Sequence, residues 1–76
     1  MKELVEFIAR ALVDKPEDVK VTETDGERSL IIELRVAPED MGKVIGKQGK
    51  IAQSIRTLTK ATAAKEGKRV AVEIMR

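Results

Sequence analysis

Residues 44–51 of the chain are Val44-Ile45-Gly46-Lys47-Gln48-Gly49-Lys50-Ile51, two glycines three positions apart with aliphatic residues on both sides. Apolar residues recur at helical spacing before and after these residues, so we expect helices over 38–45 and 49–65. The glycines then lie in a tight turn between two helices. Because glycine has no Cβ, it adopts positive φ easily and allows another molecule to approach the backbone closely.

The start of the second expected helix has no ordinary capping residue. Lys47, Gln48 and Gly49 stand where a Ser, Thr, Asp or Asn would accept hydrogen bonds from the first N–H groups. Free N–H groups at a helix start attract anions, and Lys43, Lys47 and Lys50 add positive charge around them. The turn is therefore predicted to bind the sugar-phosphate backbone of a nucleic acid. Taken alone, it is equally compatible with a plain corner whose lysines face solvent.

The formal net charge of +2 conceals an uneven distribution of charge. Residues 1–40 carry 6 basic and 11 acidic side chains, whereas residues 41–70 carry 8 basic side chains and Glu66 as their single acid. Positive charge therefore gathers on the turn, on the helix after it and on the following loop. Surfaces that merely face solvent usually mix both signs, so this one-sided charge favours a polyanionic partner.

The composition argues against several classes of function. A chain of 76 residues forms one small domain. The lack of cysteine and histidine removes thiol chemistry and the commonest acid–base catalyst and metal ligand. No apolar run is long enough to cross a membrane, and Lys2 and Glu3 open an amphipathic segment instead of a signal peptide. We expect a cytoplasmic, non-catalytic protein without cofactor, metal, membrane association or small-molecule substrate.

Three helices, over 3–13, 38–45 and 49–65, are expected to cover the core. The first spans residues 3–13, and its predicted apolar face consists of Leu4, Ile8, Ala11 and Leu12, with Val5 beside it. Phe7, the single aromatic residue, is predicted to fill the core. In the helix over 49–65, the predicted apolar stripe consists of Ile51, Ala52, Ile55, Leu58 and Ala63.

Three strands are expected where apolar residues alternate with polar ones. Val19 and Val21 mark the first strand, and Asp25-Gly26 predicts a hairpin to a second strand over 28–36. The core-facing residues of the second strand are predicted to be Leu30, Ile32, Leu34 and Val36, and those of the last strand Val70, Val72 and Ile74. A right-handed crossover through the two helices places the last strand parallel to the second, on the side opposite the first.

The sequence at this point resembles a known family. Val44-Ile45-Gly46-Lys47-Gln48-Gly49 is similar to the (Val/Ile)-Ile-Gly-x-x-Gly signature of KH domains, and the order of elements resembles the bacterial, type II arrangement. The similarity extends end to end to small stand-alone bacterial proteins that consist of one KH domain. It implies a single α+β domain over 1–76, an α-β-β-α-α-β fold in which three helices cover one face of a three-stranded mixed sheet.

The resemblance also implies a function. In KH domains the GxxG loop clamps the backbone of single-stranded RNA, and bases lie in an apolar groove. Together with the basic residues around the turn, the expected RNA-binding residues are Lys43, Ile45, Gly46, Lys47, Gln48, Gly49, Lys50, Ile51, Lys68 and Arg69. The resemblance further implies a homodimer, or a heterodimer with a larger, multidomain KH protein of the Jag type. It links the chain to RNA regulation or chaperoning and to cell elongation and division.

Two other hypotheses stay open on the sequence alone. Gln53, Arg56 and Lys60 could form the recognition face of a helix-turn-helix module that reads duplex DNA. Alternatively, the groove receives protein and the chain is an interaction or dimerisation module. A preference for single-stranded RNA over duplex DNA separates the first hypothesis from RNA binding. Acidic substitutions in the loop separate the second hypothesis from RNA binding, because they are expected to abolish RNA binding but to leave protein binding intact.

Overall fold

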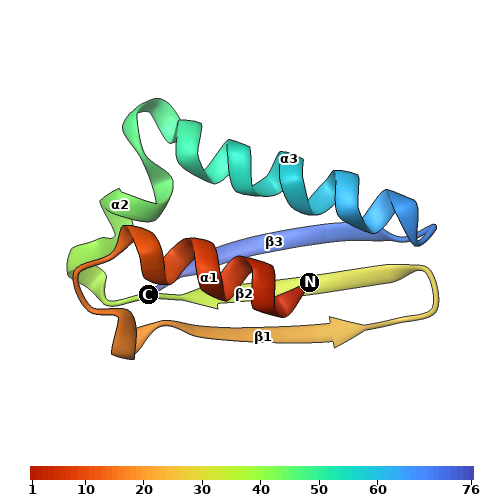
Figure 1. Cartoon of the computed structure of the whole chain (residues 1–76), viewed down its shortest axis with the longest axis horizontal. Coiled ribbons are helices and arrows are strands. Elements are labelled where there is room, and N and C mark those ends of the chain that lie inside the picture. The colour runs from red at the N-terminus through yellow and green to blue at the C-terminus, as the bar shows by residue number, and fades with distance from the viewer.

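The computed structural model describes all residues 1–76 (Figure 1). Its helices and strands are α1 (Lys2–Leu12), β1 (Lys20–Asp25), β2 (Ser29–Arg35), α2 (Met41–Ile45), α3 (Lys50–Lys65) and β3 (Arg69–Met75). Short 3₁₀ turns occupy Pro16–Asp18, Pro38–Asp40 and Lys47–Gly49. The predicted order of elements and the α+β class are confirmed. The helix expected over 38–45 is divided into a 3₁₀ turn and the five-residue α2.

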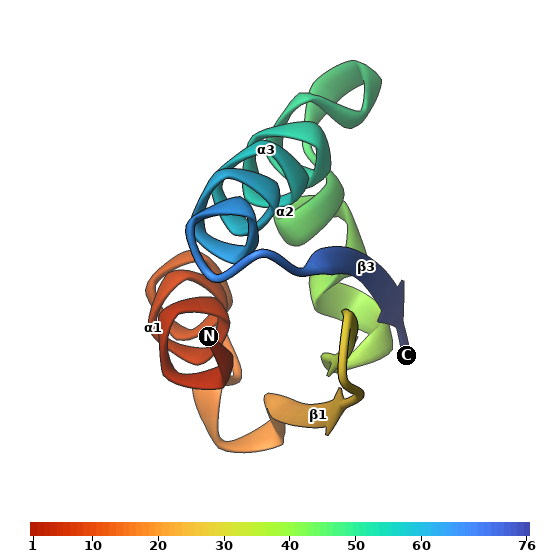
Figure 2. The ribbon, with the colours of Figure 1, turned by 90° about the vertical axis from the view of Figure 1, so that its right-hand side faces the viewer.

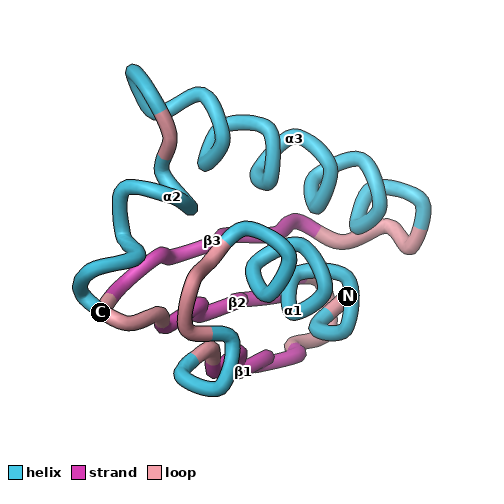
Figure 3. Tube along the Cα trace, turned by 60° about the vertical axis from the view of Figure 1, so that its left-hand side comes forward, coloured by secondary structure: helices cyan, strands magenta, loops and turns pink.

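The sheet has the strand order β1-β2-β3. β1 pairs antiparallel with β2, with Val21 opposite Leu34, and β3 pairs parallel with β2, with Val72 opposite Ile32. The parallel pair is joined by a crossover through α2 and α3, as predicted. Figure 2 shows that the helices lie together on one side of the sheet, and the tube in Figure 3 shows the same arrangement from another side.

β2 supplies the centre of the core. Leu30, Ile32, Leu34 and Val36 are each at most 4% exposed, while Ile31, between two of them, is 42% exposed. Successive side chains of a strand point to opposite faces, so one face of β2 is covered by helices and the other is open. The predicted core face of this strand is confirmed.

The apolar face of α1 differs from the prediction. Val5 and Ala9 are fully buried, whereas Ala11 is exposed and Phe7 is 74% exposed. Successive helical residues are about 100° apart, so a face centred on Val5 and Ala9 directs Phe7 to the opposite side. The prediction that Phe7 fills the core is wrong, and the predicted placement of Ala11 is wrong as well.

The buried stripe of α3 also differs at one position. It consists of Ala52, Ile55, Thr59 and Ala63, and Leu58 is 52% exposed. The prediction that Leu58 belongs to the core is therefore wrong. Thr59 lies on this stripe by helical spacing, and its buried hydroxyl donates to the carbonyl of Arg56 at 3.0 Å. A buried hydroxyl with a partner avoids the desolvation penalty that an unpaired one carries.

The hairpin between β1 and β2 forms where it was predicted, but its tip is one residue later. The N–H group of Gly26 donates to the carbonyl of Ser29 at 2.7 Å, which leaves Glu27 and Arg28 at the tip. Gly26 does not adopt positive φ. The dipeptide Asp25-Gly26 therefore marks the end of the ladder and not the turn itself.

Candidate nucleic-acid interface

The candidate interface begins at Gly46, where α2 ends. Gly46 has φ 78° and ψ 173°, a region that only glycine populates readily. A Cβ on Gly46 would lie 2.5 Å from Cγ1 of Ile51, so the first turn of α3 packs directly against the Gly46 backbone. Backbone conformation and packing thus both require glycine at this position.

Two further residues of the loop, Gln48 and Gly49, also have positive φ. Gly49 has φ 72° and ψ 15°, as expected for a glycine in a tight turn, and Gln48 has φ 58° and ψ 25°. Gln48 has a Cβ, so holding this conformation costs about 1–2 kcal/mol. Such strain is concentrated at functional sites. α3 then starts at Lys50 without a side-chain cap, which confirms the prediction that the helix lacks an ordinary capping residue.

Two main-chain donors of the loop are free. The N–H groups of Gly46 and Gly49 donate to the carbonyls of Gly42 and Gly46, at 2.9 and 3.1 Å, and that of Lys50 donates to Lys47. The N–H groups of Lys47 and Gln48 donate to no protein acceptor. Adjacent unpaired N–H groups in a turn form an anion-binding concavity.

The lysines of the predicted site fall into two classes. Lys47 and Lys50 are exposed and form no ion pair. Lys43 pairs with Asp14 and Lys68 pairs with Asp25, and these hydrogen bonds raise the pKa of both lysines. Phosphate must compete with a carboxylate for Lys43 and Lys68, whereas it meets Lys47 and Lys50 without competition.

The predicted site residues do not form one cluster. Residues 43–51 surround the GxxG loop, whereas Lys68 and Arg69 lie beyond the other end of α3 (Figure 1). An α-helix rises 1.5 Å per residue, so the 16 residues of α3 separate the two groups by about 24 Å. Ile45 and Ile51 are half-buried and pack against the core. A ligand that reached both ends would have to run along α3.

Two adjoining pockets lie between α3 and β3, and we call them together the α3–β3 groove. The first has a volume of about 340 Å³ and is lined by Arg56, Thr59, Lys60, Val70, Ala71 and Val72. The second, of about 500 Å³, is lined by Lys60, Ala64, Lys68, Arg69 and Val70. Both volumes are in the range of small-ligand sites. The groove therefore connects Lys68 and Arg69 with the middle of α3.

Sequence reasoning missed Arg56 and Lys60 as groove residues. Their i, i+4 spacing beside the buried stripe of α3 could have indicated a shared edge, but only the position of β3 makes that edge one wall of a groove. Val70 and Val72, which were predicted to face the core, also line the groove.

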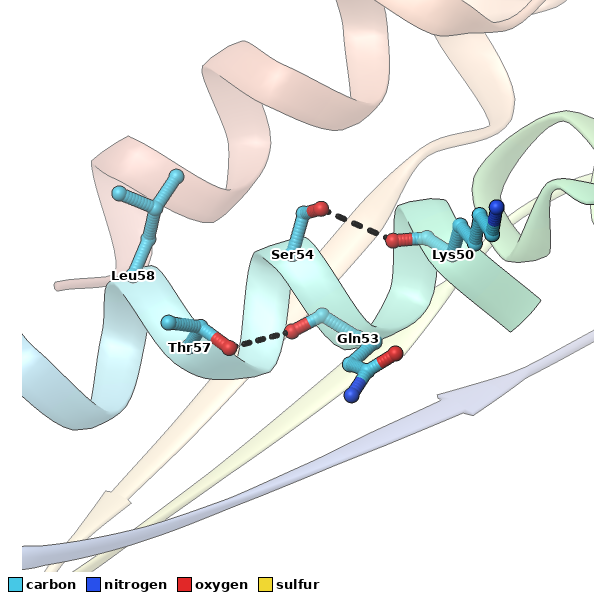
Figure 4. Close-up of a pocket in the computed structure, with 5 residues that line it drawn as sticks. All are labelled: Lys50, Gln53, Ser54, Thr57 and Leu58. Carbon is cyan, nitrogen blue, oxygen red and sulfur yellow. Dashed lines mark hydrogen bonds between the residues drawn. The ribbon is translucent and has the colours of Figure 1, made fainter.

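A further depression of about 480 Å³ lies on the outer face of α3 (Figure 4). Its lining residues are Lys50, Gln53, Ser54, Thr57 and Leu58. The hydroxyls of Ser54 and Thr57 donate to the carbonyls of Lys50 and Gln53, each at 2.9 Å. These bonds leave the ammonium group of Lys50 and the amide of Gln53 as its unpaired polar groups.

The geometry weighs against a helix-turn-helix reader of DNA. Gln53 belongs to the outer face of α3, while Arg56 and Lys60 line the groove against β3. Nε of Arg56 donates to the carbonyl of Val72 at 3.3 Å. The three residues therefore do not share one free face, and β3 flanks the side that would have to enter a major groove.

The structure offers little to other site classes. No group of three or more His, Cys, Asp or Glu side chains is arranged to hold a metal ion. None of the helices has both the length and the apolar character needed to span a membrane.

A GxxG loop between two helices, followed by a crossover to a parallel third strand, defines a type II KH domain. The chain matches the family model described as KhpA/KhpB, KH domain, over residues 2–74. It belongs to this family, and the resemblance stated from the sequence is confirmed.

Similar proteins from several bacteria share this length. "RNA-binding protein KhpA" of Clostridium perfringens is 69% identical over 75 residues, covering 99% of this chain and 100% of that protein. The protein of the same name from Caldanaerobacter subterraneus is also 69% identical, with the same coverage. The "RNA-binding protein KhpA" of Aquifex aeolicus is 52% identical over 75 residues, which cover 99% of this chain and 95% of that protein. No solved structure gives a significant match.

Proposed function

We propose that the chain binds single-stranded RNA without catalysing a reaction, through the Gly46–Gly49 loop and the α3–β3 groove. The relatives named above are RNA-binding proteins, and this chain shares their length and family. The observation that carries the proposal is the pair of unpaired N–H groups at Lys47 and Gln48, beside two lysines without ion pairs. Together they form a seat for phosphate.

The chemistry of the groove suits a nucleotide strand. Val70, Ala71 and Val72 give it an apolar wall, while Arg56, Lys60 and Arg69 border it with positive charge. No strand carries an aromatic residue, because Phe7 on α1 is the single aromatic side chain of the sequence. Bases therefore contact aliphatic side chains and main-chain groups instead of stacking on rings.

The test is the double substitution Lys47→Asp with Gln48→Asp. It places two carboxylates on the phosphate seat, so affinity for a labelled eight-nucleotide RNA, measured by fluorescence anisotropy, is expected to fall at least tenfold. A matched variant is Lys20→Asp with Thr22→Asp, which makes the same change of charge at exposed positions of β1. It is expected to retain most of the affinity. If both variants bind equally well, the loop is not the phosphate seat.

The same anisotropy measurement distinguishes RNA binding from the hypothesis of a DNA-binding helix-turn-helix module. We expect the chain to prefer the single-stranded RNA over a duplex DNA of equal length at the same ionic strength. A preference for the duplex would favour the helix-turn-helix hypothesis.

A second candidate function, dimerisation, is supported by the exposed apolar residues of the helical layer. Phe7 on α1 and Leu58 on α3 are 74% and 52% exposed. Exposed apolar side chains mark a protein–protein contact when they form a contiguous patch. We propose that they contribute to a homodimer, or to a heterodimer with a larger KH protein of the Jag type, and the name of the matching family joins KhpA with KhpB. Pairing would also add a second RNA site and raise avidity.

Sedimentation equilibrium tests the homodimer. Phe7→Ser with Leu58→Ser is expected to shift the equilibrium toward monomer without unfolding the chain, because neither side chain is buried. An unchanged dissociation constant would exclude these residues from the contact.

At the level of the cell, we propose a cytoplasmic role in RNA regulation or RNA chaperoning connected with cell elongation and division. A domain that binds short single strands without catalysis suits such a role, since it can shield or remodel RNA without altering it chemically. Crosslinking of the protein to RNA in growing cells, with the Lys47→Asp, Gln48→Asp variant as the negative control, tests it directly.

A further inference from the structure

The open edge of the sheet faces the α3–β3 groove. β3 is the last strand of the sheet and pairs on one side only. The N–H group of Arg69 and the carbonyl of Met75 bond back toward the β2 side, at 3.0 and 3.1 Å. The N–H and C=O groups of one residue point the same way and alternate along a strand. Those of Val70 and Val72 therefore point to the open edge.

Arg56 already occupies the acceptor in the middle of this edge. Its Nε–H group donates to the carbonyl of Val72 at 3.3 Å. Its remaining guanidinium N–H groups have no ion-pair or hydrogen-bond partner in the chain. The side chain thus spans the groove from α3 to β3 and presents donors to whatever enters.

The other polar groups around Val72 are donors too. The main-chain N–H group of Val72 points to the open edge, and Lys60 contributes an ammonium group. Thr59 lines the same pocket but is fully buried, and its hydroxyl donates to the carbonyl of Arg56. The carbonyl of Val70 is a free acceptor on the same edge, but a strand rises about 3.3 Å per residue, so it lies two residues and about 6.6 Å away, where the two pockets share Val70. A base seated directly beside Val72 therefore meets donors, and the acceptor at that position is already engaged.

We propose that Arg56 determines the base preference of the groove, and that a base beside Val72 is selected for carbonyl acceptors. Uracil presents its O4 carbonyl and guanine its O6 carbonyl where cytosine and adenine present the N4 and N6 amino groups, and those amino groups would lack a free partner beside Val72. A buried donor without an acceptor loses its hydrogen bond to water and gains none, which is how sites reject close analogues. This inference rests on the proposed RNA binding.

The experiment compares labelled eight-nucleotide oligouridine and oligocytidine by fluorescence anisotropy at one ionic strength. Both are pyrimidine strands of the same charge, so the phosphate contacts are matched. The unaltered chain is expected to bind oligouridine about fivefold more tightly. Equal affinities, or a preference for oligocytidine, would overturn the inference.

Arg56→Lys keeps the positive charge but replaces the planar group that holds the Val72 carbonyl with a single ammonium. The ratio of the two affinities is expected to fall below about twofold, mainly because oligocytidine binds more tightly once the carbonyl is free. Arg56→Gln, which removes both the charge and the guanidinium, is expected to lose the preference as well. A fivefold ratio that survives in both variants would assign the preference to another residue and overturn the inference.

Lys60→Gln serves as the matched control, because it removes a positive charge from the same pocket and leaves Arg56 in place. Both oligonucleotides are expected to bind more weakly, with their ratio unchanged. A ratio that falls in Lys60→Gln as much as in Arg56→Lys would reduce the effect to charge and overturn the role of Arg56. Equal binding of the two RNAs that is still abolished by Lys47→Asp with Gln48→Asp refutes the base preference alone. No binding of either RNA refutes the proposed function as well.

Discussion

The buried carboxylate of Asp40 accepts the main-chain N–H group of Lys15, with 3.0 Å between Oδ2 and the nitrogen. Its other oxygen accepts the N–H group of Asp14 at 3.2 Å. These bonds fasten the end of the α1 segment to the residue that precedes α2. Because α2 leads directly into Gly46, these hydrogen bonds of Asp40 also help to position the start of the GxxG loop.

We therefore expect Asp40→Ala to destabilise the domain by about 1–3 kcal/mol, because it leaves two main-chain donors without their acceptor. Urea unfolding followed by circular dichroism measures the change. The control is Asp18→Ala, because Asp18 is exposed and its carboxylate accepts no hydrogen bond. The free energy of unfolding of this variant is expected to stay within about 0.5 kcal/mol of that of the unaltered chain. Equal stability of the two variants would show that the contacts of Asp40 contribute nothing.

The two loop glycines are expected to respond differently to alanine. Gly46→Ala meets a glycine-only conformation and a contact of 2.5 Å with Ile51, so we expect a loss of stability of about 3 kcal/mol or more. Gly49→Ala has open space around the new methyl group and pays only for left-handed backbone, about 1–2 kcal/mol. Thermal unfolding of both variants checks this order.

A double variant isolates the packing part at Gly46. In Gly46→Ala with Ile51→Ala the contacts with Cγ1 and Cδ1 of Ile51 are removed and only the one with Cβ, at 2.9 Å, remains, so the double variant should lose less stability than the sum of the two single variants. Strict additivity would show that the outer atoms of Ile51 contribute nothing to the cost at Gly46.

Lys47 and Lys43 lie close in sequence but differ in their electrostatic surroundings. Lys47→Gln is expected to weaken RNA binding several-fold, whereas Lys43→Gln has a smaller effect because Asp14 already neutralises that ammonium. Two to four phosphate contacts give a slope of about −1.4 to −2.8 for log affinity against log salt, at about −0.7 for each contact. Lys47→Gln should reduce the magnitude of this slope by about 0.7, the value for one lost phosphate contact. A larger loss from Lys43→Gln would mean that RNA displaces Asp14.

The pair Lys15–Glu39 predicts a modest dependence of stability on pH. Their mutual hydrogen bond, aided by charge, lowers the pKa of Glu39 below 4.5 and raises the pKa of Lys15 above 10.5. A lowered carboxyl pKa stabilises the fold above the unfolded value, and this contribution is lost as the pH falls through the folded value. A raised lysine pKa stabilises below the unfolded value and is lost as the pH rises through the folded one. The pair therefore contributes between these limits.

Glu39→Gln makes this contribution measurable. The melting temperature of the unaltered chain is expected to exceed that of the variant slightly at pH 7, since the pair is exposed and surface pairs are weak. The two melting temperatures should converge as the pH falls through the folded pKa of Glu39, because below it the carboxyl is neutral. A difference that persists unchanged at low pH would have another origin.

The sheet was predictable from the sequence because its signal is local. Leu30, Ile32 and Leu34 alternate strictly with polar or exposed neighbours, and a period of two assigns each to one face without ambiguity. Helical faces are less certain. Phe7 and Leu58 are apolar and were expected in the core, but the faces of α1 and α3 are fixed by neighbours distant in sequence, and a bonded Thr59 fills the place of an apolar residue.

The local features of the candidate site were predictable in the same way as the sheet. Its contacts between distant segments were not, for the same reason as the helical faces. The absence of a side-chain cap on α3 and the positive φ of both loop glycines follow from residue types that are adjacent in the chain. The engagement of Lys43 by Asp14, the burial of Asp40 and the bond from Arg56 to Val72 depend on segments brought together only by the fold. Charge counting alone treats Lys43 and Lys47 as equivalent.

The parallel pairing of β2 with β3 has a consequence for how the domain forms. Paired residues of the two strands, such as Ser29 and Arg69, are 40 positions apart in the chain, so closing them carries an entropic cost before their contacts compensate it. During synthesis β3 emerges after α3, and the groove has no second wall until β3 joins the sheet. Under the proposed function, a nascent chain therefore gains its site for a base only when β3 pairs with β2.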